Sequence, residues 1–339
     1  MTDESSIIAR LSRNIPSCLG WMDSREVPVG IGDDAAVVRP RSGGDWVFST
    51  DAFIEGRHFL SRAHPPHAVG YKALARAVSD LAAMGAAPRY FLLTLALPAG
   101  RTGSWLERFA RGMGHAARRF GMRLIGGDVS RADCVGAALT VIGEAPHKRV
   151  LARRGARPGD ALYVSGRLGA AQTGLEILLR SGAAAGARAA RSVVLRRQLY
   201  PEPRLALGQW LAAQRLASAA MDISDGLSTD LSRLCAAGGV GAVVHAGSLP
   251  LAGSESLRSR GARRSRHDAA DLRRALHGGE DYELLFTVRP RLVTRMPREF
   301  RGVPLTRIGE IAARRAILLE RDGRMQVLRP LGWDHFARR

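Results

Sequence analysis

The sequence predicts a mixed α/β protein built from two domains. The chain has 339 residues, about twice the length of a usual domain. Short apolar runs typical of strands alternate with segments of helical periodicity, and glycine or proline residues separate them. Between residues 146 and 159 a basic stretch with turn residues interrupts this pattern. We therefore predict an N-terminal domain over residues 1–146 and a C-terminal domain over residues 147–339.

The first domain begins with a short amphipathic helix and continues with strands and helices in turn. Its central helix repeats apolar residues at helical spacing and is followed by Gly85, a residue type that commonly ends helices. The next strand is closed by Pro98. The expected helices cover residues 5–19, 68–84 and 105–120, and the expected strands cover residues 35–39, 46–50, 90–97, 123–125 and 135–142.

The second domain repeats the rhythm of strand, acidic turn and helix, without an exact internal repeat. Residues 181–190 read as a loop or a weakly formed helix start, and the arginine-rich residues 253–268 as a surface loop. The expected helices cover residues 170–180, 204–214 and 227–237, and the expected strands cover residues 161–165, 219–223, 241–245 and 283–288.

The composition is that of an ordinary globular protein. Apolar residues make up 46% of the chain and charged residues 24%. No apolar run approaches the roughly 20 residues needed to cross a bilayer. The acidic, polar start differs from a secretory signal, so we expect a cytoplasmic protein. The three cysteines are far apart and form no CxxC pair, which argues against a zinc site.

The net charge of +20 raises the alternative of nucleic-acid binding. Arginines are spread along the whole chain, however, and their local clusters lack the interleaved aromatic residues of a base-stacking surface. A solvated, arginine-rich surface is therefore the preferred interpretation, and we expect no specific nucleic-acid partner and no membrane. Such a surface is also compatible with attraction of small polyanionic substrates.

Acidic side chains set beside glycine, serine or threonine are the most informative feature of this basic chain. Crowded carboxylates raise one another's pKa unless a cation neutralises them, and a hard divalent metal is the most suitable cation. Any one of these aspartates has an ordinary explanation as a turn residue, a helix cap or a surface residue. Their number in one chain favours a metal site. The stretches are residues 30–34, 49–51, 79–80, 126–128, 222–226 and 279–282.

Asp80 makes the strongest individual case. It is predicted to lie in the last turns of a helix, where the helix dipole disfavours an anion, and an apolar run follows it. A surface ion pair with Arg76 is the ordinary alternative. By contrast, Asp33, Asp160 and Asp281 are expected to have structural roles.

The other acidic positions have weaker local signals. Asp51 ends a predicted strand, and Asp128 follows two glycines that permit close approach of a ligand. Asp222 and Asp225 precede a predicted helix, so one is expected to cap it and the other to bind a ligand. The pattern GxGxxA at residues 30–35 does not indicate a dinucleotide site, because its two aspartates would face pyrophosphate.

Ten stretches together resemble a known family. They are residues 30–36, 49–51, 56–59, 71–74, 79–86, 124–128, 157–160, 222–227, 278–284 and 332–336. From about Ile8 to Phe336 the chain is similar to the thiamine-monophosphate kinase family, whose superfamily includes aminoimidazole-ribonucleotide synthetase, selenophosphate synthetase and a hydrogenase-maturation protein. The acidic motifs of the first half are common to the superfamily, whereas residues 278–284 and 334–336 indicate the kinase.

The resemblance implies transfer of the ATP γ-phosphoryl group to thiamine monophosphate, giving thiamine diphosphate. A phosphate acceptor is already ionised near neutral pH, so no general base is required, and catalysis consists of charge neutralisation and in-line positioning by several Mg²⁺ ions. It also implies a homodimer in which the N-terminal domains together form a β-barrel. The alternatives are another ATP-using synthetase of the same superfamily and, more remotely, a basic nucleic-acid-binding protein.

The resemblance also implies roles for individual residues. His58, Glu280 and Trp333 are expected to contact thiamine monophosphate, with the aromatic ring of Trp333 stacking on it. Arg153 or its neighbour Arg154 is expected to meet the ATP phosphates, and Gly127, Asp128 and Ser224 also to contact ATP. The implied metal ligands, some acting through water, are Asp34, Ser49, Thr50, Asp51, Asp80, Asp128, Asp222 and Asp225.

Overall fold

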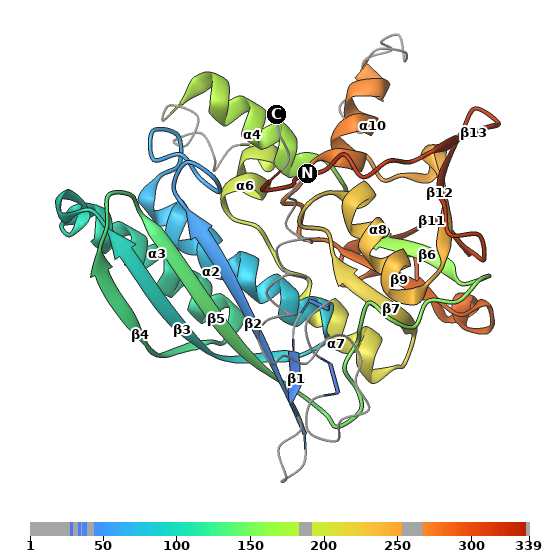
Figure 1. Ribbon diagram of the computed structural model, residues 1–339, viewed down its shortest axis with the longest axis horizontal. Helices are drawn as coiled ribbons and strands as arrows, with labels where there is room; N and C mark the ends of the chain where they lie inside the picture. Colours follow the sequence, from blue (N-terminus) through green and yellow to red (C-terminus); the bar gives the residue numbers. More distant parts are fainter. Residues whose placement is uncertain are drawn as a thin grey trace.

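The computed structural model describes residues 28–29, 33–34, 36–38, 44–182, 192–252 and 267–336. The helix expected over residues 5–19 and nearly all of the segments 181–190 and 253–268 lie outside these residues. The described chain has a mixed α/β architecture with two mixed sheets, as the sequence predicts, and neither sheet is closed into a barrel. Figure 1 shows the two sheets beside each other, with α2 behind the first sheet and its end directed toward the second.

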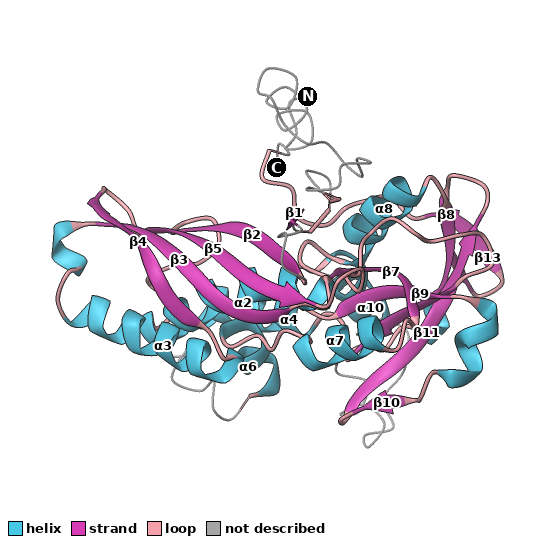
Figure 2. Ribbon diagram, turned by 90° about the horizontal axis from the view of Figure 1, so that it is seen from below, coloured by secondary structure: helices cyan, strands magenta, loops and turns pink. Residues whose placement is uncertain are grey.

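The first sheet has five strands in the order β1-β2-β5-β3-β4. Only the β3–β4 pair is parallel. One face of the sheet is covered by helices and the other is open (Figure 2). The strands are β1 (Ala36–Val38), β2 (Asp45–Ile54), β3 (Ala87–Leu97), β4 (Arg123–Arg131) and β5 (Gly136–Ala145), and the main covering helices are α2 (Pro66–Ala83) and α3 (Ser104–Phe120).

Two strands differ from the sequence-based expectation in ways that affect the site. β2 continues to Ile54, so Ser49, Thr50 and Asp51 lie inside the strand and not at its end. β4 runs to Arg131, so the strand does not stop at the two glycines before Asp128. Both strands gain length because each pairs along a long partner, β5 or β3, and these pairings are not visible in local sequence patterns.

The second sheet has eight strands, with β13-β12-β8-β11-β6-β9-β7 as its main path and β10 paired to β11. Its final strands and α10 were not predicted. The strands are β6 (Ala161–Ser165), β7 (Ala217–Asp222), β8 (Gly241–His245), β9 (Leu284–Val288), β10 (Glu299–Phe300), β11 (Val303–Ala312), β12 (Ile317–Arg321) and β13 (Arg324–Val327). The helices are α4 (Ala170–Ser181), α6 (Val193–Leu199), α7 (Leu205–Ala213), α8 (Leu227–Gly238) and α10 (His267–His277), with short 3-10 turns at Ala99–Arg101, Ala246–Ser248 and Pro290–Arg295.

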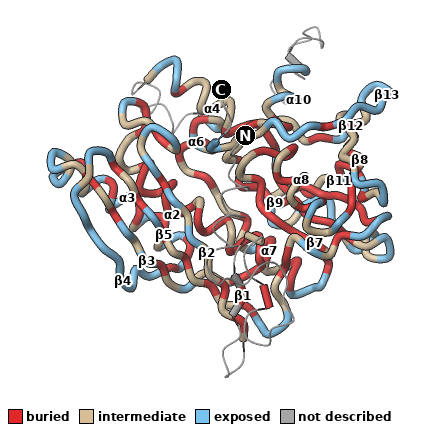
Figure 3. The backbone as a smooth tube through the Cα atoms, viewed as in Figure 1, coloured by how far each residue is buried: buried red, intermediate tan, exposed pale blue. Residues whose placement is uncertain are grey.

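Helix α2 joins the two cores and thereby positions the site. Its apolar residues Leu74 and Val78 are fully buried against the first sheet. Near its end, Ala82 and Ala83 instead belong to a cluster with Leu211 of α7. The last turns of α2 therefore lie against the second sheet as well, and Figure 3 shows this helix buried along most of its length.

Close backbone approach between α2 and α3 explains two glycines at their crossing. A Cβ atom added to Gly70 would lie 1.9 Å from the Phe109 carbonyl oxygen, and one added to Gly112 would lie 1.8 Å from the His67 carbonyl oxygen. Any side chain at either position would force the helices apart. Within the described residues, no helix combines the length and apolar character needed to span a membrane.

Candidate active site

Three carboxylates that are far apart in the sequence meet between the two sheets. Asp34 precedes β1, Asp80 lies in the last turn of α2, and Asp222 ends β7. One oxygen of each lies within 4.8 Å of the others. Their convergence depends on α2, because its last turns contact both sheets.

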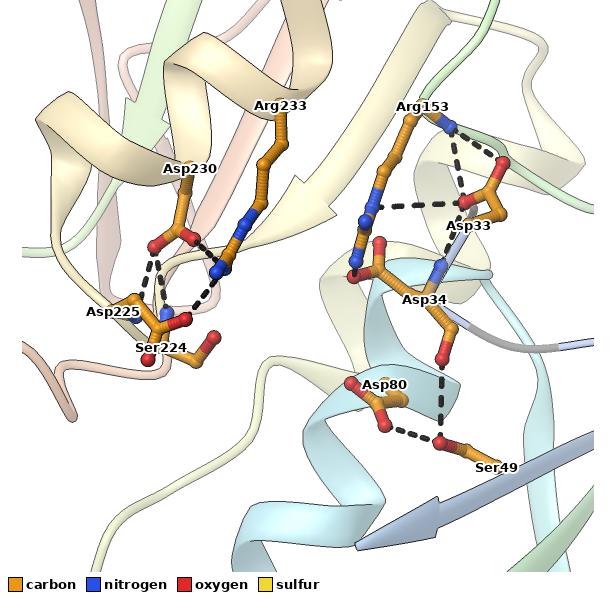
Figure 4. A network of polar contacts seen from close by, with 9 residues as sticks. All are labelled: Asp33, Asp34, Ser49, Asp80, Arg153, Ser224, Asp225, Asp230 and Arg233. Carbon is orange, nitrogen blue, oxygen red and sulfur yellow. Dashed lines mark hydrogen bonds and ion pairs between the residues drawn. The ribbon is translucent and has the colours of Figure 1, made fainter. Parts of the chain in front are cut away.

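Ser49 connects β2 to this carboxylate cluster, which we define as Asp34, Asp80 and Asp222. Its hydroxyl donates a hydrogen bond to Asp80 Oδ2, and it lies 3.2 Å from the backbone carbonyl oxygen of Asp34. Figure 4 shows the Ser49 hydroxyl between the Asp80 carboxylate and the backbone oxygen of Asp34, whose own carboxylate is directed to Arg153. Arg76, the alternative partner of Asp80, lies 3.6 Å from Asp51 instead.

The cluster is short of positive charge. Burial, together with the charges of Asp222 and Asp34, raises the pKa of Asp80 well above its usual value. Burial, followed by the charge of Asp34, raises the pKa of Asp222 to about 7. Asp34 Oδ2 is buried and has no hydrogen-bond partner among the residues that the structure describes. Buried, mutually repelling oxygen ligands with an unsatisfied acceptor fit a hard divalent cation such as Mg²⁺.

Arg153 lies beside the cluster, whereas its neighbour Arg154 is exposed. The guanidinium of Arg153 forms an ion pair with Asp34. Its backbone N–H donates to Asp33 Oδ2 at 3.1 Å, and Asp33 Oδ1 accepts from the Asp34 N–H at 2.9 Å. Asp33 therefore fixes the relative positions of the two segments, as its expected structural role requires.

The turn after β7 is organised by a residue that the sequence analysis did not single out. Asp230 is fully buried in the first turn of α8, and its Oδ2 accepts hydrogen bonds from the backbone N–H groups of Ser224 and Asp225, both at 3.0 Å. The expected capping by Asp222 or Asp225 is not seen, because the N-cap residue is Gly226 and makes no side-chain cap. The sequence signal that could have identified Asp230 is its position as an acidic residue in the first turn of a predicted helix.

Arg233 of α8 was also missed by the sequence analysis. Its Nη1 lies 2.5 Å from Asp225 Oδ2 and 3.0 Å from Asp230 Oδ1. This arginine holds the Asp225 carboxylate beside the Ser224 turn (Figure 4). Its spacing from Asp230 indicates a helix-surface ion pair, but nothing local in the sequence shows that Asp225 shares it.

Successive side chains of β2 point to opposite faces of the sheet, so the polar residues Ser49, Thr50 and Asp51 do not all point the same way. Ser49 and Asp51 share one face of the strand, while Thr50 points to the opposite face, where its hydroxyl accepts a hydrogen bond from Thr140 at 3.3 Å. The Thr50 side chain is therefore not gathered with the carboxylate cluster within this chain.

Gly127 and Asp128 lie on the outer strand β4. Asp128 is paired with Thr94, Thr94 with Ala138, and Ala138 with Ala52 of β2. Asp128 is therefore three strand spacings, on the order of 14 Å, from β2. This row of residues lies on the open face of the sheet, opposite to Ser49 and Asp51. A single chain thus keeps Asp128 away from the carboxylate cluster.

The residues expected to contact the acceptor form a second group next to the first. The Glu280 N–H donates to the Ser224 carbonyl oxygen at 2.7 Å, and the Trp333 N–H donates to the Asp225 carbonyl oxygen at 2.9 Å. Both residues are thereby fixed to the turn after β7. His335 lies between the rings of Trp333 and His58, at centroid distances of 5.5 and 5.1 Å.

His58 is uncharged in this arrangement. Burial, then the nearby charge of Arg76, lowers the pKa of His58 to about 3. Its Nδ1 accepts a hydrogen bond from the Ile54 N–H at 3.0 Å, which leaves the proton on Nε2. His58 can therefore donate a hydrogen bond to a ligand or stack against it.

The other two aspartates with expected structural roles lie next to strands of the second sheet, Asp160 directly before β6 and Asp281 in the loop before β9. Asp160 Oδ2 accepts hydrogen bonds from the Ser218 hydroxyl at 2.7 Å and from Arg289 at 3.1 Å. Asp281 accepts from the Gly169 and Ala171 N–H groups at 2.7 and 3.3 Å, and so satisfies backbone donors at the start of α4.

Comparisons with known proteins identify the family of both halves of the chain. Residues 32–145 match the family model of the AIR synthase related protein, N-terminal domain, and residues 157–320 match that of its C-terminal domain. The thiamine-monophosphate kinase of Escherichia coli (strain K12) is 39% identical over 340 residues, covering 98% of each chain. That of Bacillus subtilis (strain 168) is 32% identical, covering 91% of this chain and 94% of the relative.

A solved structure of a relative has a similar fold over practically the whole chain. AaThiL complexed with AMPPCP and TMP is 31% identical, with a TM-score of 0.78, and the match covers 98% of this chain and 97% of that one. Sequence and structure agree over practically the full length, and the chain therefore belongs to the thiamine-monophosphate kinase family.

Proposed function

We propose that this protein transfers the γ-phosphoryl group of ATP to thiamine monophosphate, giving ADP and thiamine diphosphate. The observation that carries the proposal is the position of the carboxylate cluster directly beside the acceptor group of Glu280, Trp333 and His58. The end of β7 supplies Asp222 to the cluster, and the turn that follows fixes Glu280 and Trp333 through backbone hydrogen bonds. A related structure contains both an ATP analogue and TMP, which supports this pair of substrates.

Asp34, Asp80 and Asp222 are the proposed Mg²⁺ ligands, with Ser49, Asp51 and Asp225 at the edge of the set. When bound, Mg²⁺ would neutralise charge on the phosphate groups and fix their geometry. The chain itself keeps the carboxylates converged in a buried place, where their attraction for a cation is only weakly screened. Arg153 can meet ATP phosphate oxygens with its planar guanidinium. Ser224 lies in the turn after β7, two residues beyond Asp222.

The acceptor needs orientation more than activation. Its phosphate is already ionised near neutral pH, so a side chain that removes a proton is not required. Glu280, Trp333 and His58 are proposed to hold the ring system of thiamine monophosphate, so that its phosphate faces the donor. Reaction then follows from proximity and alignment of the two phosphate groups.

A homodimer is part of the proposal, because one face of the first sheet is uncovered. β4 is exposed along all nine residues, and its apolar side chains Leu124, Ile125 and Val129 are 55%, 54% and 68% exposed. Figure 3 shows this exposed strand at the edge of the sheet. An open edge strand bearing apolar residues is suited to pairing with another chain. We infer that two copies pack these faces together into a shared barrel.

The proposed dimer also gives Gly127 and Asp128 a role. Both residues lie on the edge strand β4, and Asp128 faces the open side of the sheet, away from the carboxylate cluster of its own chain. A Cβ atom on Gly127 would lie 1.8 Å from the Leu93 carbonyl oxygen, so the close pairing of β4 with β3 requires glycine there. We propose that each subunit supplies Asp128 to the ATP site of the other.

The function is tested by incubating the purified protein with ATP, Mg²⁺ and thiamine monophosphate and measuring ADP and thiamine diphosphate. Asp80→Asn should abolish turnover while the fold is retained, because the neutral amide replaces a buried carboxylate whose pKa is already raised. Asp322→Asn, on an exposed turn, is the matched control. Absence of thiamine diphosphate with the unaltered protein would sink the proposal and favour a sister synthetase. Steeply salt-dependent nucleic-acid binding unaffected by Asp80→Asn would favour the nucleic-acid alternative.

A further inference from the structure

Lys72 is a buried cation in helix α2. It lies in the middle of α2, and its side chain is only 1% exposed. Burying an ammonium group costs several kcal/mol unless a partner compensates it. The residue therefore needs a specific partner, and the sequence gives no partner within one helical turn.

That partner is Glu280. Lys72 Nζ lies 2.8 Å from both carboxylate oxygens of Glu280, and Gln198 Nε2 of α6 donates to Glu280 Oε2 at 2.7 Å. Lys72 and Gln198 are both 1% exposed, whereas the Glu280 side chain is 23% exposed. Two buried donors thus bind the carboxylate, and part of the Glu280 side chain remains accessible.

The backbone of Glu280 is held in an uncommon conformation at the same place. Its φ angle is +68°, in the left-handed region that non-glycine residues seldom adopt. The hydrogen bond from its N–H to Ser224 and the contacts of its side chain with Lys72 and Gln198 together compensate this cost. The backbone conformation and these hydrogen bonds together fix the direction of the Glu280 carboxylate.

The charge of Lys72 also sets the chemical form of Glu280. Burial alone would raise the pKa of Glu280, but the charges of Lys72 and Arg76 hold it below its usual value. An ionised carboxylate only accepts hydrogen bonds, so it matches a ligand that offers an N–H group. The aminopyrimidine ring of thiamine offers one, on its exocyclic amino group.

We propose that Lys72 is a positioning residue, which orients Glu280 so that the carboxylate accepts a hydrogen bond from the ring amino group of the acceptor. This inference rests on the proposed function. It assigns acceptor selectivity to a buried ion pair between α2 and the loop before β9. Lys72 itself does not touch the substrate.

The test compares Lys72→Met, Glu280→Gln and the double variant, with thiamine monophosphate and with oxythiamine monophosphate, which has a carbonyl oxygen in place of the ring amino group. Lys72→Met should raise KM for thiamine monophosphate by about tenfold or more, because a misplaced or protonated Glu280 loses a charge-assisted hydrogen bond. The preference for thiamine monophosphate over its oxo analogue should shrink by a similar factor. Binding of AMPPCP, measured by calorimetry, should change by less than about twofold.

The double variant distinguishes a loss of Glu280 positioning from a loss of folding stability. Lys72→Met leaves an unpaired buried carboxylate, whereas Lys72→Met with Glu280→Gln removes both charges. If the two residues act together, the double variant should be no worse than Glu280→Gln alone. Lys148→Met, which removes the exposed Lys148 ammonium, is the matched lysine control and should behave as the unaltered protein.

Three results would overturn the inference while leaving the proposed function intact. They are an unchanged acceptor KM in Lys72→Met, unchanged discrimination against the oxo analogue, and additive effects of the two substitutions. If the unaltered protein makes no thiamine diphosphate, the proposed function fails instead, so the two failures are distinguishable.

Discussion

The guanidinium of Arg153 forms an ion pair with Asp34, although the two residues lie 119 positions apart in the sequence. Asp34 belongs to the carboxylate cluster, so this arginine supplies positive charge at the place where ATP phosphates are proposed to bind. Its neighbour Arg154 is exposed. The structure places Arg153, the residue that the sequence analysis named first, beside the carboxylate cluster and leaves its alternative Arg154 exposed.

Arg153→Ala should weaken binding of AMPPCP in the presence of Mg²⁺ by about tenfold to a hundredfold, the usual effect of losing a charge-assisted contact with a phosphate group. Arg154→Ala should change it by less than about twofold, because an exposed charge is screened by salt. Calorimetric titration of both variants checks this. Equal losses for the two variants would argue that only net charge matters.

Mixed dimers test whether Asp128 serves the other subunit. Asp80→Asn and Asp128→Asn should each abolish turnover when alone. After unfolding together and refolding as a mixture, half of the dimers should contain one copy of each variant. If Asp128 acts across the dimer, each mixed dimer has one intact site, and about a quarter of normal activity should return.

The same mixture stays inactive if Asp80 and Asp128 serve one site from one chain. Refolding each variant separately gives the background value. A monomeric protein in sedimentation measurements would exclude the explanation altogether.

Mg²⁺ binding should strengthen as pH rises from 6 to 8. The pKa of Asp222 is raised to about 7 by burial and by Asp34, so Mg²⁺ must displace a proton at pH 6 but not at pH 8. In the metal-free protein the sign is opposite: the folded state holds this proton more tightly than the unfolded chain, so Asp222 stabilises the fold below about pH 4, and this contribution is lost as pH rises through about 7.

Thermal unfolding with and without Mg²⁺ at the two pH values measures this linkage. The increase in Tm caused by Mg²⁺ should be larger at pH 8. Asp222→Asn should reduce the increase and its dependence on pH. An increase in Tm of equal size at pH 6 and pH 8 would contradict the proton-linked site.

The crossing of α2 and α3 predicts opposite effects for two glycines of one helix. Gly112→Ala should destabilise the protein by about 1–3 kcal/mol, because the added Cβ collides with the His67 backbone. Gly114 has only the flexible end of Arg118 within 4 Å, so Gly114→Ala should stabilise α3 by up to about 1 kcal/mol. Calorimetric measurement of the free energy of unfolding of both variants tests this prediction. Stabilisation of both variants by similar amounts would show that helix propensity and not backbone contact governs this helix.

Much of the local structure could be predicted from the sequence because it depends on local patterns. The helix expected over residues 68–84 is α2 with small shifts of its ends, and Gly121 follows α3 in the left-handed conformation expected of a helix stop. The strand expected over residues 123–125 was too short, because Gly126 and Gly127 usually end a strand. Pairing with β3 carries β4 past them.

By itself the sequence determined the alternation of strands and helices, the abundance of carboxylates in a basic chain and the family resemblance. Only the tertiary structure decided which of those carboxylates meet. Asp34, Asp80 and Asp222 converge because α2 packs against both sheets, whereas Asp128 is turned to the open face by the register of β4. The pairing of Lys72 with Glu280 across 208 positions is of the same kind. Periodicity encodes which face of an element is apolar, but which polar side chains meet depends on long-range packing.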